Sequence, residues 1–198
     1  MKTQKIISTK VASIAIVATL LLAIVACDGK QMNTSLEKEA TLSVQKAKTP
    51  STDIHTAAFM GNLEAIKEHI NAGSDLNVKD AYGSSPLTIA ATFNKLEIAK
   101  ALIEAGADLN STNNDGSTPL HTAAFLCRTE IVKALLEKGA DKTLKNNYGS
   151  TALESVAGPW ENVVEIYYQF SKNLGPFGLK LDYDQLKTTR PIIAEMLR

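Results

Sequence analysis

The heptapeptide Ser85-Pro86-Leu87-Thr88-Ile89-Ala90-Ala91 recurs further along the chain as Thr118-Pro119-Leu120-His121-Thr122-Ala123-Ala124. A weaker copy precedes it by the same interval, as Thr52-Asp53-Ile54-His55-Thr56-Ala57-Ala58. Two glycine series repeat at this interval: Gly83, Gly116 and Gly149, and Gly73, Gly106 and Gly139. Self-similarity at one fixed period predicts a chain built from stacked copies of one small unit.

The copy at residues 113–145 indicates what one unit contains. Gly116 allows the backbone angles of a tight turn, and Pro119 favours the first turn of a helix. A second helix is predicted by apolar residues at helical spacing: Ile131, Val132, Leu135 and Leu136. Gly139 is expected to end that helix in a left-handed conformation. One copy is therefore expected to be a hairpin loop followed by two antiparallel helices, which pack closely at the small Ala123 and Ala124.

The period of the glycine series and the string Thr-Pro-Leu-His-Thr-Ala-Ala resemble the ankyrin repeat. The resemblance implies an all-α solenoid of about four repeats, each a helix-turn-helix with a β-hairpin loop. We place the repeats at about 51–79, 80–112, 113–145 and 146–198. In the last repeat the match to 131–136 lies at 192–197, whereas an uninterrupted period would place it at 164–169. We therefore expect an insertion at about 158–187, which either caps the stack or forms a partner site.

Residues 1–26 are typical of a bacterial lipoprotein signal peptide. Three Lys without an acid in residues 1–10 precede sixteen uncharged residues, a run that is short for a transmembrane helix. The run ends in Ile24-Val25-Ala26-Cys27, which resembles a lipobox and implies that Cys27 is lipidated with acyl chains such as palmitate. Asp28 resembles the residue that retains lipoproteins in the inner membrane. The polar residues 27–50 are expected to form a flexible tether.

Composition and motifs favour a protein that is not an enzyme. The 21 basic side chains balance the 21 acidic ones, which excludes a nucleic-acid binder that works by bulk charge. The sequence holds no phosphate-binding glycine loop, HExxH helix or CxxC pair, so no catalytic residue, cofactor or metal is predicted. His55 and His121 occupy equivalent repeat positions, and the resemblance to ankyrin repeats implies that their rings bond neighbouring backbone. His69 is expected to be a solvated capping residue.

Cys127 occupies the turn between two helices, where Gly61 and Asn94 stand in the earlier copies. If Cys27 carries lipid, Cys127 is a lone thiol in an oxidising compartment. Either burial of the thiol or a redox role explains its presence there, and the sequence around it gives no reason for a low thiol pKa.

The resemblance also implies that protein partners bind to the hairpin tips and the inner helices. The hairpin positions carried over are Ala81, Tyr82, Ser84, Asn114, Asp115, Ser117, Asn147, Tyr148 and Ser150. The inner-helix positions are Phe59, Met60, Thr92, Phe93, Phe125 and Leu126. Aromatic and large apolar side chains grouped on a surface mark an interface, although inward packing stays open for Phe93 and Leu126.

The expected function is that of a monomeric scaffold that is tethered by lipid in the periplasm and binds a protein partner. The periplasmic face of the inner membrane is favoured over the outer membrane. Two alternatives stay open. One is an immunity or protective protein for a toxin or an envelope enzyme, and the other is a thiol redox protein that uses Cys127.

Overall fold

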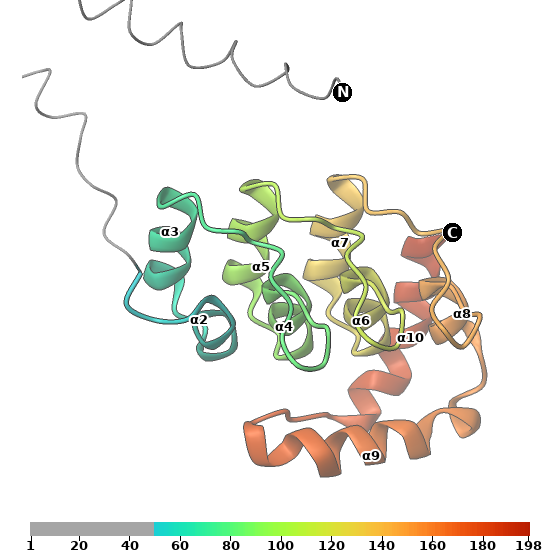
Figure 1. Cartoon of the computed structure of the whole chain (residues 1–198). Coiled ribbons are helices and arrows are strands. Elements are labelled where there is room, and N and C mark those ends of the chain that lie inside the picture. Colours follow the sequence, from blue (N-terminus) through green and yellow to red (C-terminus); the bar gives the residue numbers. More distant parts are fainter. Residues whose placement is uncertain (1–49) are drawn as a thin grey trace, which may run out of the picture. The chain divides into compact units, whose positions relative to one another are not determined.

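The computed structural model describes residues 50–198, which form a row of helix pairs (Figure 1). The expected signal peptide at 1–26, the lipidation site Cys27 and nearly all of the expected tether at 27–50 lie outside these residues. The first three pairs are α2 (Ile54–Met60) with α3 (Leu63–Asn71), α4 (Pro86–Thr92) with α5 (Leu96–Glu104), and α6 (Pro119–Phe125) with α7 (Thr129–Glu137). Residues 50–198 contain no strand, so the predicted all-α repeat solenoid is confirmed, while the hairpin loops are turns without a β-ladder.

The pairs stack in two rows. An inner row contains α2, α4, α6 and α8 (Ala152–Ala157), and each of these helices packs against the next. The outer row contains α3, α5 and α7, which also pack in sequence. Each pair covers the apolar side of its neighbour, so the stability of the stack is close to a sum of contacts between adjacent repeats.

Capping residues fix where the inner helices begin. Ser85, Thr118 and Thr151 stand one repeat period apart, and each side-chain hydroxyl accepts the backbone N–H three positions on. Pro86 and Pro119 follow the first two caps, where a missing N–H costs no helical hydrogen bond. The recurring heptapeptide is therefore a helix start repeated in register.

The turn after each of the first three inner helices, α2, α4 and α6, is left-handed. The backbone angle φ is 75° at Gly61, 53° at Asn94 and 54° at Cys127. Only glycine adopts such an angle without strain, and Asn tolerates it better than most residues. Gly61, Asn94 and Cys127, which the sequence places at equivalent positions, thus share one backbone conformation. Cys127 is exceptional because cysteine rarely adopts it.

The core lies between the two rows and is built on small residues. Three alanine pairs at the middle of the inner helices are fully buried: Ala57 and Ala58, Ala90 and Ala91, and Ala123 and Ala124. Larger side chains from the outer row, such as Leu102 and Leu135, are also fully buried against this layer. Because alanine lacks atoms beyond Cβ, the inner and outer helices approach closely, as the sequence predicts.

The hairpin loops are tied to one another by side-chain amides. The Asn114 amide nitrogen donates to the carbonyl of Ala81 at 3.2 Å, and the equivalent Asn147 donates to the carbonyl of Asn114 at 3.0 Å. Gly83 lies next to the contact between Asn114 and Ala81, and its backbone angle φ is 71°. A Cβ atom at this position would lie 2.8 Å from the backbone nitrogen of Asn114. Gly83 and its equivalent Gly116, where a Cβ would lie 2.9 Å from the backbone nitrogen of Asn147, therefore permit adjacent loops to touch.

The C-terminal segment differs from the sequence expectation in one boundary. After α8 come a 3-10 turn at Trp160–Asn162, α9 (Val164–Leu174), a second 3-10 turn at Gly175–Phe177 and α10 (Tyr183–Leu197). The end of α10 buries Ile193, Ala194 and Leu197 and packs against α8, so α10 stands where the outer row continues (Figure 1). This helix begins at Tyr183, inside the segment expected as insert, because the Asp182 carboxylate caps its start.

His69 is not the solvated residue that we expected. Its side chain is half-buried, Nε2 lies 2.7 Å from the Thr52 carbonyl oxygen, and Nδ1 lies 3.1 Å from the Ser74 hydroxyl. The ring therefore joins the start of the first repeat to the end of α3. It terminates the stack through polar contacts rather than through exposure to water.

Candidate functional site

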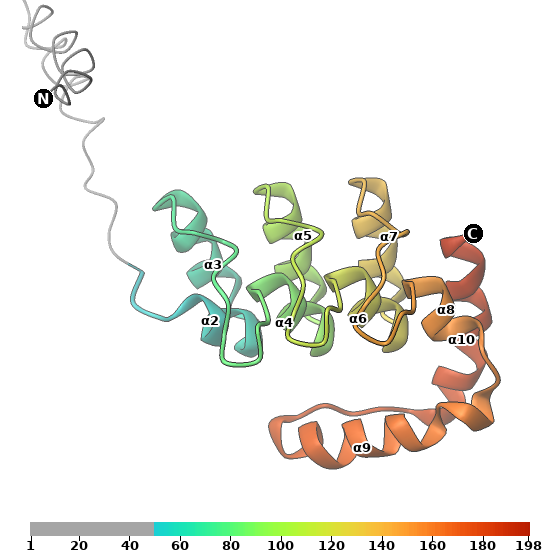
Figure 2. The ribbon, with the colours of Figure 1, turned by 45° about the vertical axis from the view of Figure 1, so that its right-hand side comes forward.

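A groove of about 610 Å³ runs along the inner row, between the hairpin loops and α9. In Figures 1 and 2, α9 extends from the α8 end of the stack back beneath α6 and toward α4. Residues from the hairpins, from the inner helices and from the insert all line this groove. The insert therefore supplies a wall of the groove as well as part of the C-terminal end of the molecule.

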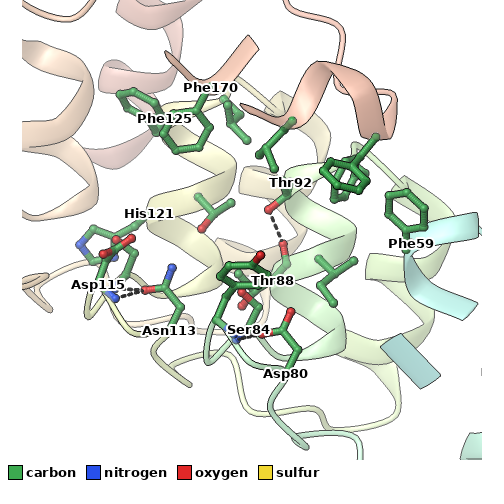
Figure 3. A pocket seen from close by; sticks show the side chains of 18 of the residues that line it. Phe59, Asp80, Ser84, Thr88, Thr92, Asn113, Asp115, His121, Phe125 and Phe170 are labelled. Carbon is green, nitrogen blue, oxygen red and sulfur yellow. Dashed lines mark hydrogen bonds between the residues drawn. The ribbon is translucent and has the colours of Figure 1, made fainter. Parts of the chain in front are cut away.

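Aromatic rings form one side of the groove. The rings of Phe59 and Phe93 meet edge to face at 4.7 Å, and those of Phe125 and Phe170 lie 5.5 Å apart (Figure 3). Phe170 belongs to α9, whereas the other three rings belong to successive inner helices or their ends. Phe177 also lines the groove and is 63% exposed. Such rings offer apolar contact area with few side-chain rotations to freeze.

The hairpin loops form the opposite, polar side. Asp80, Asn113 and Asn146 hold equivalent positions, and one oxygen of each accepts the N–H groups two and four residues on, at 2.8–3.1 Å. These bonds fix the loop shape in each repeat. Between the two sides lie Thr88 and Thr92, and the Thr92 hydroxyl donates to the Thr88 carbonyl at 2.9 Å (Figure 3).

Two side chains hold α9 in place. The Tyr167 hydroxyl donates to the Phe125 carbonyl at 2.6 Å and accepts from the Arg190 guanidinium at 3.0 Å. Arg190 is 3% exposed and also donates to the carbonyls of Ser155 and Gly158, at 3.4 and 3.1 Å. The Tyr167 ring stacks on Phe125 at 4.5 Å, and burial raises the pKa of its hydroxyl to about 12. The wall of the groove is therefore fixed to an inner helix.

Nine of the fifteen predicted partner residues line the groove. They are Phe59, Tyr82, Ser84, Thr92, Phe93, Asp115, Ser117, Phe125 and Leu126. Leu126 is 1% exposed, so its side chain packs inward. Phe93 is half-buried and lines the groove.

The other six predicted partner residues lie outside the groove: Met60, Ala81, Asn114, Asn147, Tyr148 and Ser150. Asn114 and Asn147 donate hydrogen bonds to the neighbouring hairpin, as described above. The backbone carbonyl of Ser150 accepts a hydrogen bond from the His121 ring. Met60 and Tyr148 are exposed, at 67% and 76%. Sequence reasoning missed Phe170, Leu174 and Phe177, which line the groove from the insert.

The two equivalent histidines bond backbone, as expected. Nε2 of His55 lies 2.9 Å from the Val78 carbonyl oxygen, and Nε2 of His121 lies 3.0 Å from the Ser150 carbonyl oxygen. The Thr118 N–H donates to Nδ1 of His121, so Nε2 carries the proton of a neutral ring. Burial lowers the pKa of His121 below its ordinary value. The His55 ring thus joins α2, and the His121 ring joins α6, to the chain that follows the outer helix of the same repeat.

Cys127 lies away from the aromatic groove, under the start of α10. The distance from its Sγ to the Leu186 carbonyl oxygen is 3.8 Å, and burial raises the pKa of the thiol to about 11. A thiol with this pKa is almost wholly protonated near pH 7, and the protonated form is a poor nucleophile. Among residues 50–198, no three His, Cys, Asp or Glu side chains are grouped so that they could hold a metal ion.

Within the same residues, none of the helices combines the length and the apolar character that crossing a membrane requires. A search among curated proteins found no match to the chain. A family model for ankyrin repeats in three copies matches residues 54–156, which is more than half of the sequence. Proteins of this family generally mediate contacts between proteins and are typically not enzymes. On this match and on the stacked helix pairs, the chain belongs to the ankyrin-repeat family.

Proposed function

We propose that this protein is a lipid-tethered, non-enzymatic scaffold in the bacterial periplasm, which binds a segment of a protein partner in the groove beside α9. The groove carries the proposal, because aromatic side chains from three repeats and from the insert face one elongated space. Ankyrin repeats generally mediate protein interaction, which supports a protein as the ligand. We propose that the chain acts as a monomer.

The insert narrows what the groove accepts. In an open ankyrin stack the hairpins and inner helices face solvent, but here Phe170, Leu174 and Phe177 line one side of the groove. A volume of about 610 Å³ is within the ~300–1,000 Å³ of ligand pockets and is small for a folded domain. An extended segment of a partner is the ligand that this shape favours.

The tether rests on the sequence. The basic start, the apolar run and Ile24-Val25-Ala26-Cys27 support lipidation of Cys27, and Asp28 supports retention at the inner membrane. Two or three acyl chains on one residue give lasting attachment, since each buried methylene contributes about 0.8 kcal/mol. Mass spectrometry of the mature N-terminus tests this part: acylated Cys27 is expected, and an intact Met1 or an unmodified Cys27 contradicts it.

A variant that fills the groove tests the proposed interface. Thr122 lines the groove from α6 and is half-buried, so Thr122→Trp places a large ring in the binding space. Lys133→Trp adds the same ring at an exposed position of α7 in the same repeat. We expect affinity capture from the native envelope to lose its partner with Thr122→Trp and keep it with Lys133→Trp, both variants having the wild-type circular dichroism spectrum. Equal capture by the two variants contradicts the groove as the interface.

The thiol alternative has a separate test. The raised pKa and the partial burial of Cys127 argue against nucleophilic or redox use of the thiol. Cys127→Ser is expected to leave partner capture unchanged. Loss of capture or of a cellular function with this variant, while the fold is intact, would favour the redox alternative.

A further inference from the structure

The charges along the groove have one sign. Two carboxylates, Asp80 and Asp115, line it, and within the described part of the chain none of the lining residues is Lys or Arg. The two histidines of the lining are occupied by backbone carbonyls. The guanidinium groups of Arg128 and Arg190 donate to the carbonyls of two lining residues, Thr92 and Ser155, so the charged side chains that a ligand meets on the lining are the two carboxylates.

Both carboxylates have bonding capacity left. The two bonds that Asp80 accepts, from the N–H groups of Tyr82 and Ser84, go to the same oxygen, Oδ1. Asp115 is exposed, and its contact with the Tyr148 hydroxyl is long, at 3.5 Å. Neither carboxylate takes part in any of the ion pairs found among residues 50–198.

The negative charge and the aromatic rings lie on opposite sides. Figure 3 shows Asp80 and Asp115 at the hairpin edge, and Phe125 and Phe170 at the edge that α9 forms. In an extended peptide, successive side chains point to opposite sides. A strand that lies along the groove thus directs every second side chain to the carboxylates and the others to the rings.

We infer that the groove recognises an extended segment of a protein partner in which basic residues alternate with apolar ones. This inference rests on the proposed function and names the partner's chemistry. Lys or Arg side chains form charge-assisted hydrogen bonds with Asp80 and Asp115, and the ring of Tyr82, 77% exposed beside them, is placed to contact a cation. The apolar residues pack against the rings of Phe125 and Phe170, which contact each other and line the groove. An acidic segment of the same size is repelled, which gives the groove selectivity by charge.

Synthetic peptides provide the probe. We would measure the Kd of the purified full chain for an acetylated hexapeptide that alternates Lys with Phe. The comparison peptides alternate Glu with Phe, alternate Gln with Phe, or place three Lys before three Phe. The alternating basic peptide is expected to bind at least about tenfold more tightly than the acidic one. The block peptide, whose side chains do not match the two edges, is expected to bind more weakly than the alternating one.

The chain offers a matched pair of variants. Asn113 and Asn146 hold the position of Asp80 in later repeats and make the same backbone bonds, so Asp80→Asn keeps the loop and removes its charge. Combined with Asp115→Asn, it is expected to weaken the alternating basic peptide about tenfold or more and to leave the Gln peptide within about twofold. Asp108→Asn removes an exposed carboxylate that does not line the groove and is expected to change neither Kd.

Three results would overturn the inference: equal affinity for the basic and acidic peptides, no binding of any peptide, or equal loss of affinity in Asp108→Asn and the groove variants. The capture experiment with Thr122→Trp judges the proposed function separately. If Thr122→Trp abolishes capture while the peptides show no preference for charge, the groove remains the interface and the basic segment is the wrong ligand.

Discussion

The groove has two walls that are built in different ways. The wall of inner helices follows from a pattern that recurs along the stack, with hydroxyl caps at Ser85 and Thr118 and with buried alanine pairs and left-handed turns in the first three repeats. The α9 wall occurs once and is held by Tyr167 and Arg190, which bond carbonyls of Phe125, Ser155 and Gly158. The repeats therefore provide a stiff surface, and a few side chains far apart in the sequence set what that surface encloses.

This contrast predicts that one wall of the groove can lose its structure while the other keeps it. Damage to a repeat removes contacts on which its neighbours depend, because no repeat buries its apolar surface alone. Damage to the Tyr167 contacts frees α9 and leaves the repeats stacked. Three measurements sharpen or break this distinction.

The largest effect is expected from Leu102→Ala, which removes a core side chain of α5 in the stack of repeats. Leu102 is fully buried between adjacent pairs, and removal of such a side chain costs about 3 kcal/mol in the free energy of unfolding. Urea denaturation followed by circular dichroism measures this loss. Ile166→Ala on α9, where the side chain is 46% exposed, is the control and is expected to cost less than about 0.5 kcal/mol. Similar losses in the two variants would contradict the assignment of the core.

A smaller and local effect is expected from Tyr167→Phe. The ring and its stacking on Phe125 remain, but the Phe125 carbonyl and the buried Arg190 guanidinium each lose a hydrogen bond, at a cost of about 1–3 kcal/mol. Amide hydrogen exchange should accelerate along α9 while α4 and α6 stay protected.

Tyr168→Phe provides the neighbouring control, since Tyr168 is 56% exposed and is expected to leave exchange unchanged. If Tyr167→Phe accelerated exchange in all the repeats equally, the two walls would form one cooperative unit. The proposed separation between them would then be wrong.

The smallest effect concerns how the stability of the repeats depends on pH through His121 in α6. Burial lowers the pKa of His121 in the folded state below its ordinary value of 6.5, so the unfolded chain takes up a proton first as the pH falls. The contribution of His121 to stability is complete above about pH 6.5 and declines as the pH falls from there toward the lower folded pKa. Below the folded pKa the decline stops.

Urea midpoints at pH 7.5, 6.5 and 5.5 measure this dependence. The wild-type midpoint is expected to fall over this interval, and His121→Asn, which has no titrating ring, is expected to show a smaller fall from a lower starting value. An identical pH dependence in the two proteins would show that His121 does not titrate as its burial predicts.

The same contrast explains how far sequence reasoning reaches. The solenoid could be predicted because the residues that determine its local geometry recur at a fixed interval. These residues include the turn glycines Gly83 and Gly116 and the helix caps Ser85 and Thr118. The aromatic side of the groove followed in part, since Phe59 and Phe125 hold equivalent positions in their copies and Phe93 stands one position later in the copy between them.

The position of α9 could not be predicted in this way. Its docking depends on the hydrogen bond from Tyr167 to Phe125, far back in the chain, and on Arg190, which lies beyond the other end of α9. A single buried arginine does not produce a repeating pattern in the sequence, so its role could not be predicted from the repeats. For Leu126 the sequence left both surface exposure and inward packing open, and the structure shows that the side chain packs inward.

The central claim is that the partner lies between the hairpin loops and α9. Hydrogen exchange of the full chain with and without the captured partner tests this claim most directly. The account predicts slower exchange at 80–84 and 113–117 and along 167–177, with no change in α3, α5 and α7 of the outer row. Protection confined to the outer row, or none at α9, would contradict it.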